Sequence, residues 1–258
     1  DFGAEMSCCV TKNYYSPQKN RILLLHTAEI RRKTHLRQPY CNLYHYAGNN
    51  PVRYIDPDGQ ATLDIQQQLL TVNTDGNRSG RKLNSVRSVV MHWTGVPGQT
   101  AQQTRNFFAL SSTATSAHYV VGQKGEIIQM IPDDEVAYHA GGVGKALTNF
   151  AKEHYKTPNG TVVPNLYTIG IEVNPDTAAG SYTKAAYKNS AALAAKVLNN
   201  NRLGSIFGVL FKGNLVRHGD ITGKNCPKKF MDNGFSWFCF KVFVCFELLK
   251  LKIKGSEE

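Results

Sequence analysis

The pattern of apolar and polar residues predicts a sheet in the middle of the chain. Two segments rich in apolar residues, 86–93 and 167–173, are typical of strands that are buried in a sheet. Two shorter apolar segments, residues 117–121 and 126–131, flank a Gln-Lys-Gly turn and are expected to form a hairpin. Because a hairpin is antiparallel, we expect a mixed sheet.

Apolar residues at helical spacing predict helices between these strands. The clearest pattern covers residues 181–199, where Ala191 and Leu198 lie on one side together with other small apolar residues. A second helix is expected over residues 100–110. Since strands alternate with helices, the predicted class is α/β: a single domain with a central mixed β-sheet flanked by helices.

Three further segments have weaker patterns. We expect a short helix at residues 63–70 and a strand at residues 207–216 that leads into His218. Residues 235–246 are apolar and aromatic, and they are expected to pack as a strand or to aggregate if exposed. The charged residues of this tail argue against a membrane span: Lys241, Glu247, Lys250 and Lys252.

One stretch near the end of the chain concentrates residues that suit a metal ion. His218 and Cys226 offer an imidazole nitrogen and a thiolate sulfur, which are both good zinc ligands. His92, at the end of the predicted strand 86–93, is the candidate third ligand, because binding residues collect at strand ends in open α/β sheets. Three protein ligands leave a fourth position open, as in a catalytic zinc site.

Four segments in a fixed order resemble a known family. They are residues 90–95 (VMHWTG), 116–121 (SAHYVV), 168–173 (TIGIEV) and 218–227 (HGDITGKNCP). Together they resemble the type-2 N-acetylmuramoyl-L-alanine amidases, which share their fold with peptidoglycan recognition proteins and several phage endolysins. The resemblance covers roughly residues 63–232 and implies a central sheet with helices packed on it.

The resemblance implies a zinc-dependent hydrolase that acts on peptidoglycan, at the amide between N-acetylmuramic acid and the L-alanine of the stem peptide. It implies Zn²⁺ held by His92, His218 and Cys226. Glu172 is expected to take a proton from the attacking water, and Lys224 to stabilise the oxyanion. Taken alone, Glu172 also fits a surface carboxylate, and Lys224 fits a solvated cationic cluster.

Three further residues are candidates for substrate contacts. Trp93 follows the candidate ligand His92, His118 lies in the predicted hairpin, and His139 lies in a glycine-rich loop. For both histidines a packing role is an equal alternative.

A separate resemblance concerns the beginning of the chain. Residues 42–59 (NLYHYAGNNPVRYIDPDG) resemble the end of the RHS repeat-associated core of polymorphic toxins. This resemblance implies a toxin effector, with an immunity protein as a possible partner. The expected organisation has four parts: an RHS-core-like remnant (1–60), a linker or lead-in (61–85), a zinc amidase catalytic domain (86–232) and an unassigned aromatic tail (233–258).

Charge and composition limit the classes of molecule that the chain is expected to bind. The formal net charge of +11 favours polyanions, either nucleic acid or a phosphate-rich bacterial wall. Basic residues and aromatic residues are not interleaved as in nucleic-acid modules, so we expect peptidoglycan and no nucleic acid. No signal peptide is visible at the start, but the predicted substrate implies a secreted or cell-envelope-acting protein. Two alternatives stay open: a peptidoglycan-binding module without catalysis, and a toxin directed at nucleic acid.

Overall fold

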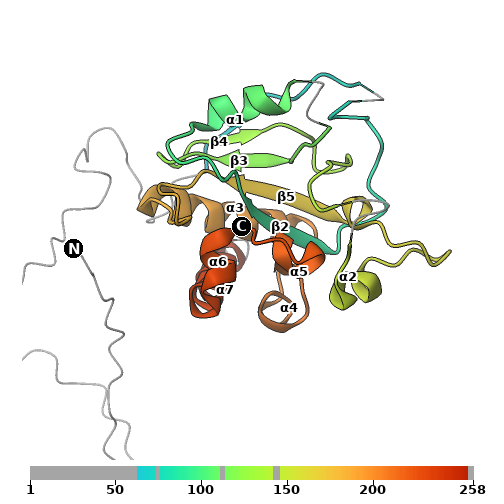
Figure 1. Ribbon diagram of the computed structural model, residues 1–258. Helices are drawn as coiled ribbons and strands as arrows, with labels where there is room; N and C mark the ends of the chain where they lie inside the picture. The colour runs from blue at the N-terminus through green and yellow to red at the C-terminus, as the bar shows by residue number, and fades with distance from the viewer. Residues whose placement is uncertain (1–62, 74–75, 111–113, 142–145, 255–258) are drawn as a thin grey trace, which may run out of the picture. The chain divides into compact units, whose positions relative to one another are not determined.

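A sheet of six strands in the order β1-β4-β3-β5-β2-β6 forms the centre of the computed structural model (Figure 1). The structure describes residues 63–73, 76–110, 114–141 and 146–254. The strands are β1 (Ile65–Gln67), β2 (Ser88–Trp93), β3 (Tyr119–Val121), β4 (Ile127–Gln129), β5 (Thr168–Val173) and β6 (Leu215–Arg217). The strands β3 and β4 pair antiparallel, and the other neighbours pair parallel. The predicted hairpin and the predicted mixed sheet are therefore confirmed.

Helices cover both faces of this sheet. Figure 1 shows α1 on one side and α3, α6 and α7 on the other. The helices are α1 (Ala101–Phe108), α2 (Asn149–His154), α3 (Lys184–Asn200), α4 (Ile206–Phe211), α5 (His218–Thr222), α6 (Lys228–Asp232) and α7 (Gly234–Lys254), with a 3-10 turn, η3, at Pro164–Leu166. Four of these helices begin with a capping residue whose side-chain hydroxyl accepts a backbone N–H of the first turn. The capping residues are Thr100, Thr148, Thr183 and Ser205.

The alternation of side chains along each strand creates two cores. Val89 and Met91 of β2 face the first core, where α3 and α7 pack on the sheet. Val90 of β2 faces the opposite side, toward Ala151 of α2. On that second side, α1 covers the β3 and β4 end of the sheet. Since His92 follows Val90 by two positions, its side chain is also placed on the second side.

The prediction of a short helix at residues 63–70 is wrong. Residues 65–67 form the edge strand β1, which pairs parallel with β4. Beyond the strand, the N–H groups of Gln68 and Leu70 donate to Gln129 O and Met130 O, both at 2.9 Å. Pairing with β4 satisfies the backbone in an extended form, and this tertiary contact outweighs the local helical preference.

The predicted strand at residues 207–216 is a helix, α4, in its first half. Ser205 caps α4, and only the end of the segment, β6, is extended. The tail is not a strand either, because residues 234–254 form the helix α7. Its buried residues Trp237, Phe240, Val244 and Leu248 recur every three or four positions, so they face the first core from one side of the helix. An apolar run without clear periodicity fits a buried helix as well as a strand.

The helix α7 is the longest in the described part of the chain. No helix among the described residues is both long and apolar enough to span a membrane.

Candidate metal centre and active site

The three predicted ligands converge at one edge of the sheet. The candidate ligand atoms of His92, His218 and Cys226 all lie within 4.8 Å of one another. His92 Nδ1 is 3.9 Å from Cys226 Sγ, and the ring centroids of His92 and His218 are 4.7 Å apart. The strands β2 and β6 run parallel, so His92 near the end of β2 and His218 just after β6 reach the same edge.

A short loop returns the chain from His218 to Cys226. The Gly219 N–H donates to Cys226 O at 2.8 Å, which closes this loop. A Cβ on Gly219 would lie 2.4 Å from the Met231 side chain and 2.6 Å from Lys224 O, so only glycine fits there. Arg217 anchors the start of the loop by an ion pair with Asp220, at 2.6 Å. These contacts hold the loop closed, so that His218 and Cys226 lie close together.

The protonation states of the histidines suit metal binding. Burial lowers the pKa of His92 well below its usual range, and His218 nearby lowers it further. Burial and the charge of Lys224 lower the pKa of His218 to about 4. Both rings are therefore neutral near pH 7, and each keeps a lone pair for a cation.

Two further observations fit a zinc ion. His218 Nδ1 is buried and has no hydrogen-bond partner among the described residues, which is costly unless a ligand satisfies it. Burial, together with the charge of Glu172, raises the pKa of the Cys226 thiol to about 12. A bound cation would offset the cost of deprotonating this buried thiol, because it stabilises the thiolate. Two imidazoles and one thiolate are a donor set that zinc prefers.

Glu172 lies beside the ligands because β5 pairs with β2. His92 and Glu172 are partners in this parallel register, and Glu172 Oε1 is 3.9 Å from His92 Nδ1. Burial raises the pKa of Glu172 to about 7, although the charge of Lys224 partly opposes this rise. Its Oε2 is buried and has no partner among the described residues. This carboxylate is therefore available to exchange a proton near neutral pH.

A cavity of about 700 Å³ opens at these residues. The three candidate ligands and Glu172 line it, together with Trp93, His139 and Lys224. Phe107 and Tyr138 also line the cavity, and the sequence patterns did not single them out. The structure thus brings together all the predicted site residues except His118.

His118 does not line this cavity. Its ring is fully buried, its Nδ1 accepts the Gly170 N–H at 3.0 Å, and its Nε2 lies 3.0 Å from Glu135 O. Since the backbone occupies both ring nitrogens, this position favours the packing role over substrate contact.

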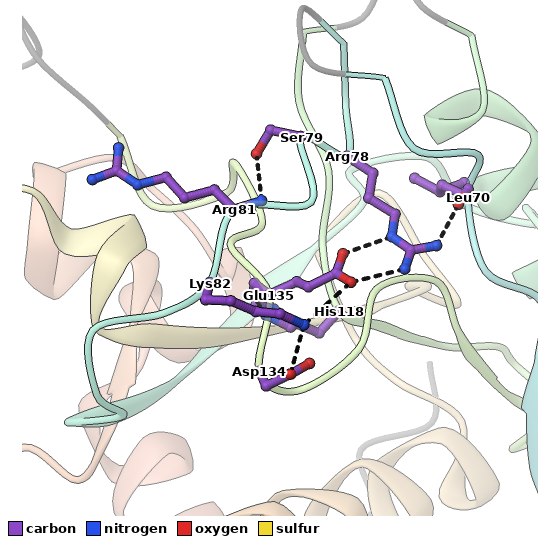
Figure 2. A network of polar contacts seen from close by, with 8 residues as sticks. All are labelled: Leu70, Arg78, Ser79, Arg81, Lys82, His118, Asp134 and Glu135. Atoms are coloured by element: carbon purple, nitrogen blue, oxygen red, sulfur yellow. Dashed lines mark hydrogen bonds and ion pairs between the residues drawn. The ribbon is translucent and has the colours of Figure 1, made fainter.

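Glu135 belongs to a polar cluster next to His118, shown in Figure 2. Arg78 donates to both carboxylate oxygens of Glu135, at 2.7 and 2.9 Å, and to Leu70 O at 2.7 Å. Lys82 adds an ion pair with Asp134 at 2.7 Å. We call this set the Arg78–Glu135 cluster; it connects Leu70, Arg78 and Lys82 to the loop after β4.

Comparisons with known proteins identify a family. The profile of the family described as N-acetylmuramoyl-L-alanine amidase matches residues 82–229. A probable N-acetylmuramoyl-L-alanine amidase of Bacillus licheniformis is 35% identical over 157 residues, which are 58% of this chain and 39% of that protein. The 1,6-anhydro-N-acetylmuramyl-L-alanine amidase AmpD of Escherichia coli (strain K12) is 31% identical over 57% of this chain and 68% of its own length.

Solved structures show the same fold. A mutant endolysin from Bacillus subtilis aligns with a TM-score of 0.53 and 25% identity, over 71% of this chain and 99% of that chain. The catalytic domain of XlyA aligns with a TM-score of 0.52 at 24% identity, over 70% of this chain and 99% of that chain.

These matches define the class of protein. The chain belongs to the N-acetylmuramoyl-L-alanine amidase family. It spans less than half the length of three Bacillus relatives that it matches, at 39%, 42% and 45%.

Proposed function

We propose that this chain is a zinc-dependent peptidoglycan hydrolase that cleaves the amide between N-acetylmuramic acid and the L-alanine of the stem peptide. The main support is the convergence of His92, His218 and Cys226 next to Glu172 in one cavity. A zinc ion held by these ligands would supply Lewis acidity toward the amide carbonyl and toward water.

The residues of the chain supply the proton transfers and the positioning. Glu172 takes a proton from the water whose oxygen attacks the carbonyl carbon, and its raised pKa suits it to this role near pH 7. The exposed Lys224 stabilises the negative charge that develops on the carbonyl oxygen. When the C–N bond breaks, Glu172 returns the proton to the leaving nitrogen. The products are a carboxylate on the sugar side and a free amino group on L-alanine.

The cavity wall accounts for binding. Trp93 and Phe107 present aromatic surface beside the polar centre, and Phe107 is half exposed. Such walls hold the substrate and exclude water from the reacting atoms.

A paired measurement on the purified chain tests this function: bound zinc per molecule, and the turbidity of purified peptidoglycan with and without a chelator. We expect bound zinc and chelator-sensitive loss of turbidity, with new L-alanine amino termini. Zinc binding without lysis, but with retention of the chain on pelleted wall, would instead support the alternative of a peptidoglycan-binding module. Absence of zinc would contradict the proposed centre.

The biological setting is proposed from resemblance. The RHS-like residues 42–59 lie outside the described part of the chain. They support an effector that acts on the cell envelope of another bacterium and that is paired with an immunity protein. Co-purification of an inhibitory partner from the producing cell would support this setting, and inhibition of the amidase activity by that partner would test it directly.

A further inference from the structure

We propose that His139 is a positioning residue that fixes which ring nitrogen of His92 faces the metal centre. The inference rests on the proposed zinc site and adds a residue to it. His92 Nε2 lies 2.9 Å from His139 Nδ1, and both rings are buried. The two rings meet edge to face, with centroids 5.0 Å apart.

The contacts of His139 with Thr168 show which nitrogen of the His139 ring carries the hydrogen. His139 Nε2 is 3.4 Å from Thr168 O and 3.2 Å from Thr168 Oγ1. A carbonyl oxygen can only accept, and the Thr168 hydroxyl already donates to Pro164 O at 3.0 Å. Both Thr168 oxygens therefore act as acceptors, and His139 Nε2 must hold the hydrogen.

This assignment continues to His92. The ring of His139 is buried and, among the described residues, its nitrogens contact only His92 and Thr168, so no carboxylate there offsets a second hydrogen; the ring is neutral and its Nδ1 has a lone pair. That lone pair accepts the hydrogen of His92 Nε2. The lone pair of His92 is then on Nδ1, the atom that lies 3.9 Å from Cys226 Sγ. The path from Thr168 through His139 thus selects the tautomer of His92 that can bind a cation.

Two features hold His139 in this place. Asn165 Oδ1 accepts the backbone N–H groups of His139 and Ala140, at 3.3 and 2.8 Å. In β5, a Cβ on Gly170 would lie 2.6 Å from His139 Cγ, so the glycine leaves room for the ring. The glycine of the segment TIGIEV is therefore explained by the approach of His139.

The first test compares zinc affinity in the full chain, by competition with a chromogenic chelator. His139→Phe keeps a ring but removes the acceptor, and we expect zinc affinity to fall about 10- to 100-fold, as is common when a ligand loses its supporting hydrogen bond. His139→Gln retains an acceptor oxygen, so it should recover part of the lost affinity. A structural role alone predicts no such recovery.

His118→Gln is the matched control. His118 is also buried, and its ring lies 5.7 Å from that of His139, but its nitrogens contact only backbone atoms. We expect this variant to lower the melting temperature while its folded molecules keep wild-type zinc affinity.

The second test measures the wild-type chain, and a variant serves only to assign the signals. Nitrogen-15 NMR of the histidine rings in the zinc-free wild-type chain should show His92 protonated at Nε2 and unprotonated at Nδ1, with its signals assigned by their absence in His92→Ala. A His92 ring protonated at Nδ1 would overturn the inference. Equal zinc affinity of His139→Phe and wild type would overturn it too, while leaving the zinc site intact. A wild-type chain that binds no zinc would reject the site and the inference together.

Discussion

Two neighbouring polar clusters differ in how completely their atoms are bonded. In the Arg78–Glu135 cluster, the carboxylate of Glu135 has two bonds from Arg78 (Figure 2). Both ring nitrogens of His118, which contacts Glu135 O, are also occupied. At the candidate metal centre, His218 Nδ1 and Glu172 Oε2 are buried and have no partner among the described residues.

This difference in bonding suggests that the first cluster serves stability and the second serves function. Buried polar groups are normally bonded, because an unbonded one costs roughly 1–3 kcal/mol. The Arg78–Glu135 cluster meets this rule and should stabilise the fold. The candidate metal centre violates this rule, as expected where the missing partner is a ligand or a substrate. The pKa values of the two carboxylates differ in the same sense. Arg78 lowers the pKa of Glu135, whereas burial raises the pKa of Glu172.

The largest expected effect comes from removing a candidate ligand. Cys226→Ser should lose bound zinc and amidase activity while the fold persists, because a hydroxyl is a poor substitute for the thiolate. The loss should exceed the ~10- to 100-fold that follows removal of a supporting hydrogen bond. Zinc analysis, circular dichroism and wall lysis measure the three outcomes. Cys245→Ser is the control, since Cys245 is also buried but packs in α7; full activity in Cys226→Ser would reject the ligand assignment.

The second prediction compares the replacement of each carboxylate by a neutral amide. Glu172→Gln should lower kcat about 10²- to 10⁴-fold and keep zinc, because the amide cannot take the proton. Its melting temperature should stay the same or rise, since an unpaired buried carboxylate is removed. Glu135→Gln should do the reverse and lower stability while the folded molecules keep their activity. If both variants lost only stability, the contrast between the clusters would be wrong.

The sequence pointed to most residues of the candidate site because they lie in one short stretch or at the ends of strands. His92 ends an apolar run, and His218 and Cys226 lie in one short stretch, so their types and spacing were visible. The role of His118 was open because its two backbone partners, Gly170 and Glu135, are distant in sequence. Phe107 and Tyr138 were missed for the same reason, since their place in the cavity depends on packing.

The fold was predicted where periodicity was strong and missed where it was weak. The pattern of residues 181–199 gave α3 almost in full, and the runs at 86–93 and 167–173 gave β2 and β5. The errors at residues 63–70, 207–216 and in the tail concern short or uniformly apolar segments. There the choice between helix and strand depends on tertiary partners, such as β4 for β1 and α3 for α7.

The third prediction concerns Lys224. Lys224→Met should lower kcat about 10²-fold with little change in zinc content, because it removes a positive charge that acts on the developing oxyanion. Lys229→Met is the control, since Lys229 is exposed, lies in the same basic stretch and does not line the cavity. Steady-state kinetics on a soluble muropeptide measure the effect. Equal losses in both variants would show that general attraction to the wall, and not oxyanion stabilisation, is the role of Lys224.

The smallest expected effect concerns the Arg78–Glu135 cluster. Arg78→Met should lower the free energy of unfolding by about 1–3 kcal/mol in urea denaturation, because the buried Glu135 loses its bonds. Lys82→Met removes a largely exposed ion pair with Asp134, which solvent screens, so it should cost less stability than Arg78→Met. Arg78 depresses the pKa of Glu135 in the folded chain. The stabilisation is therefore present above the unfolded pKa of about 4.3 and is lost as pH falls through the folded value. The difference between wild type and Arg78→Met should thus narrow in acid, and a difference that persists at the lowest pH would show that Arg78 stabilises through Leu70 O and packing instead.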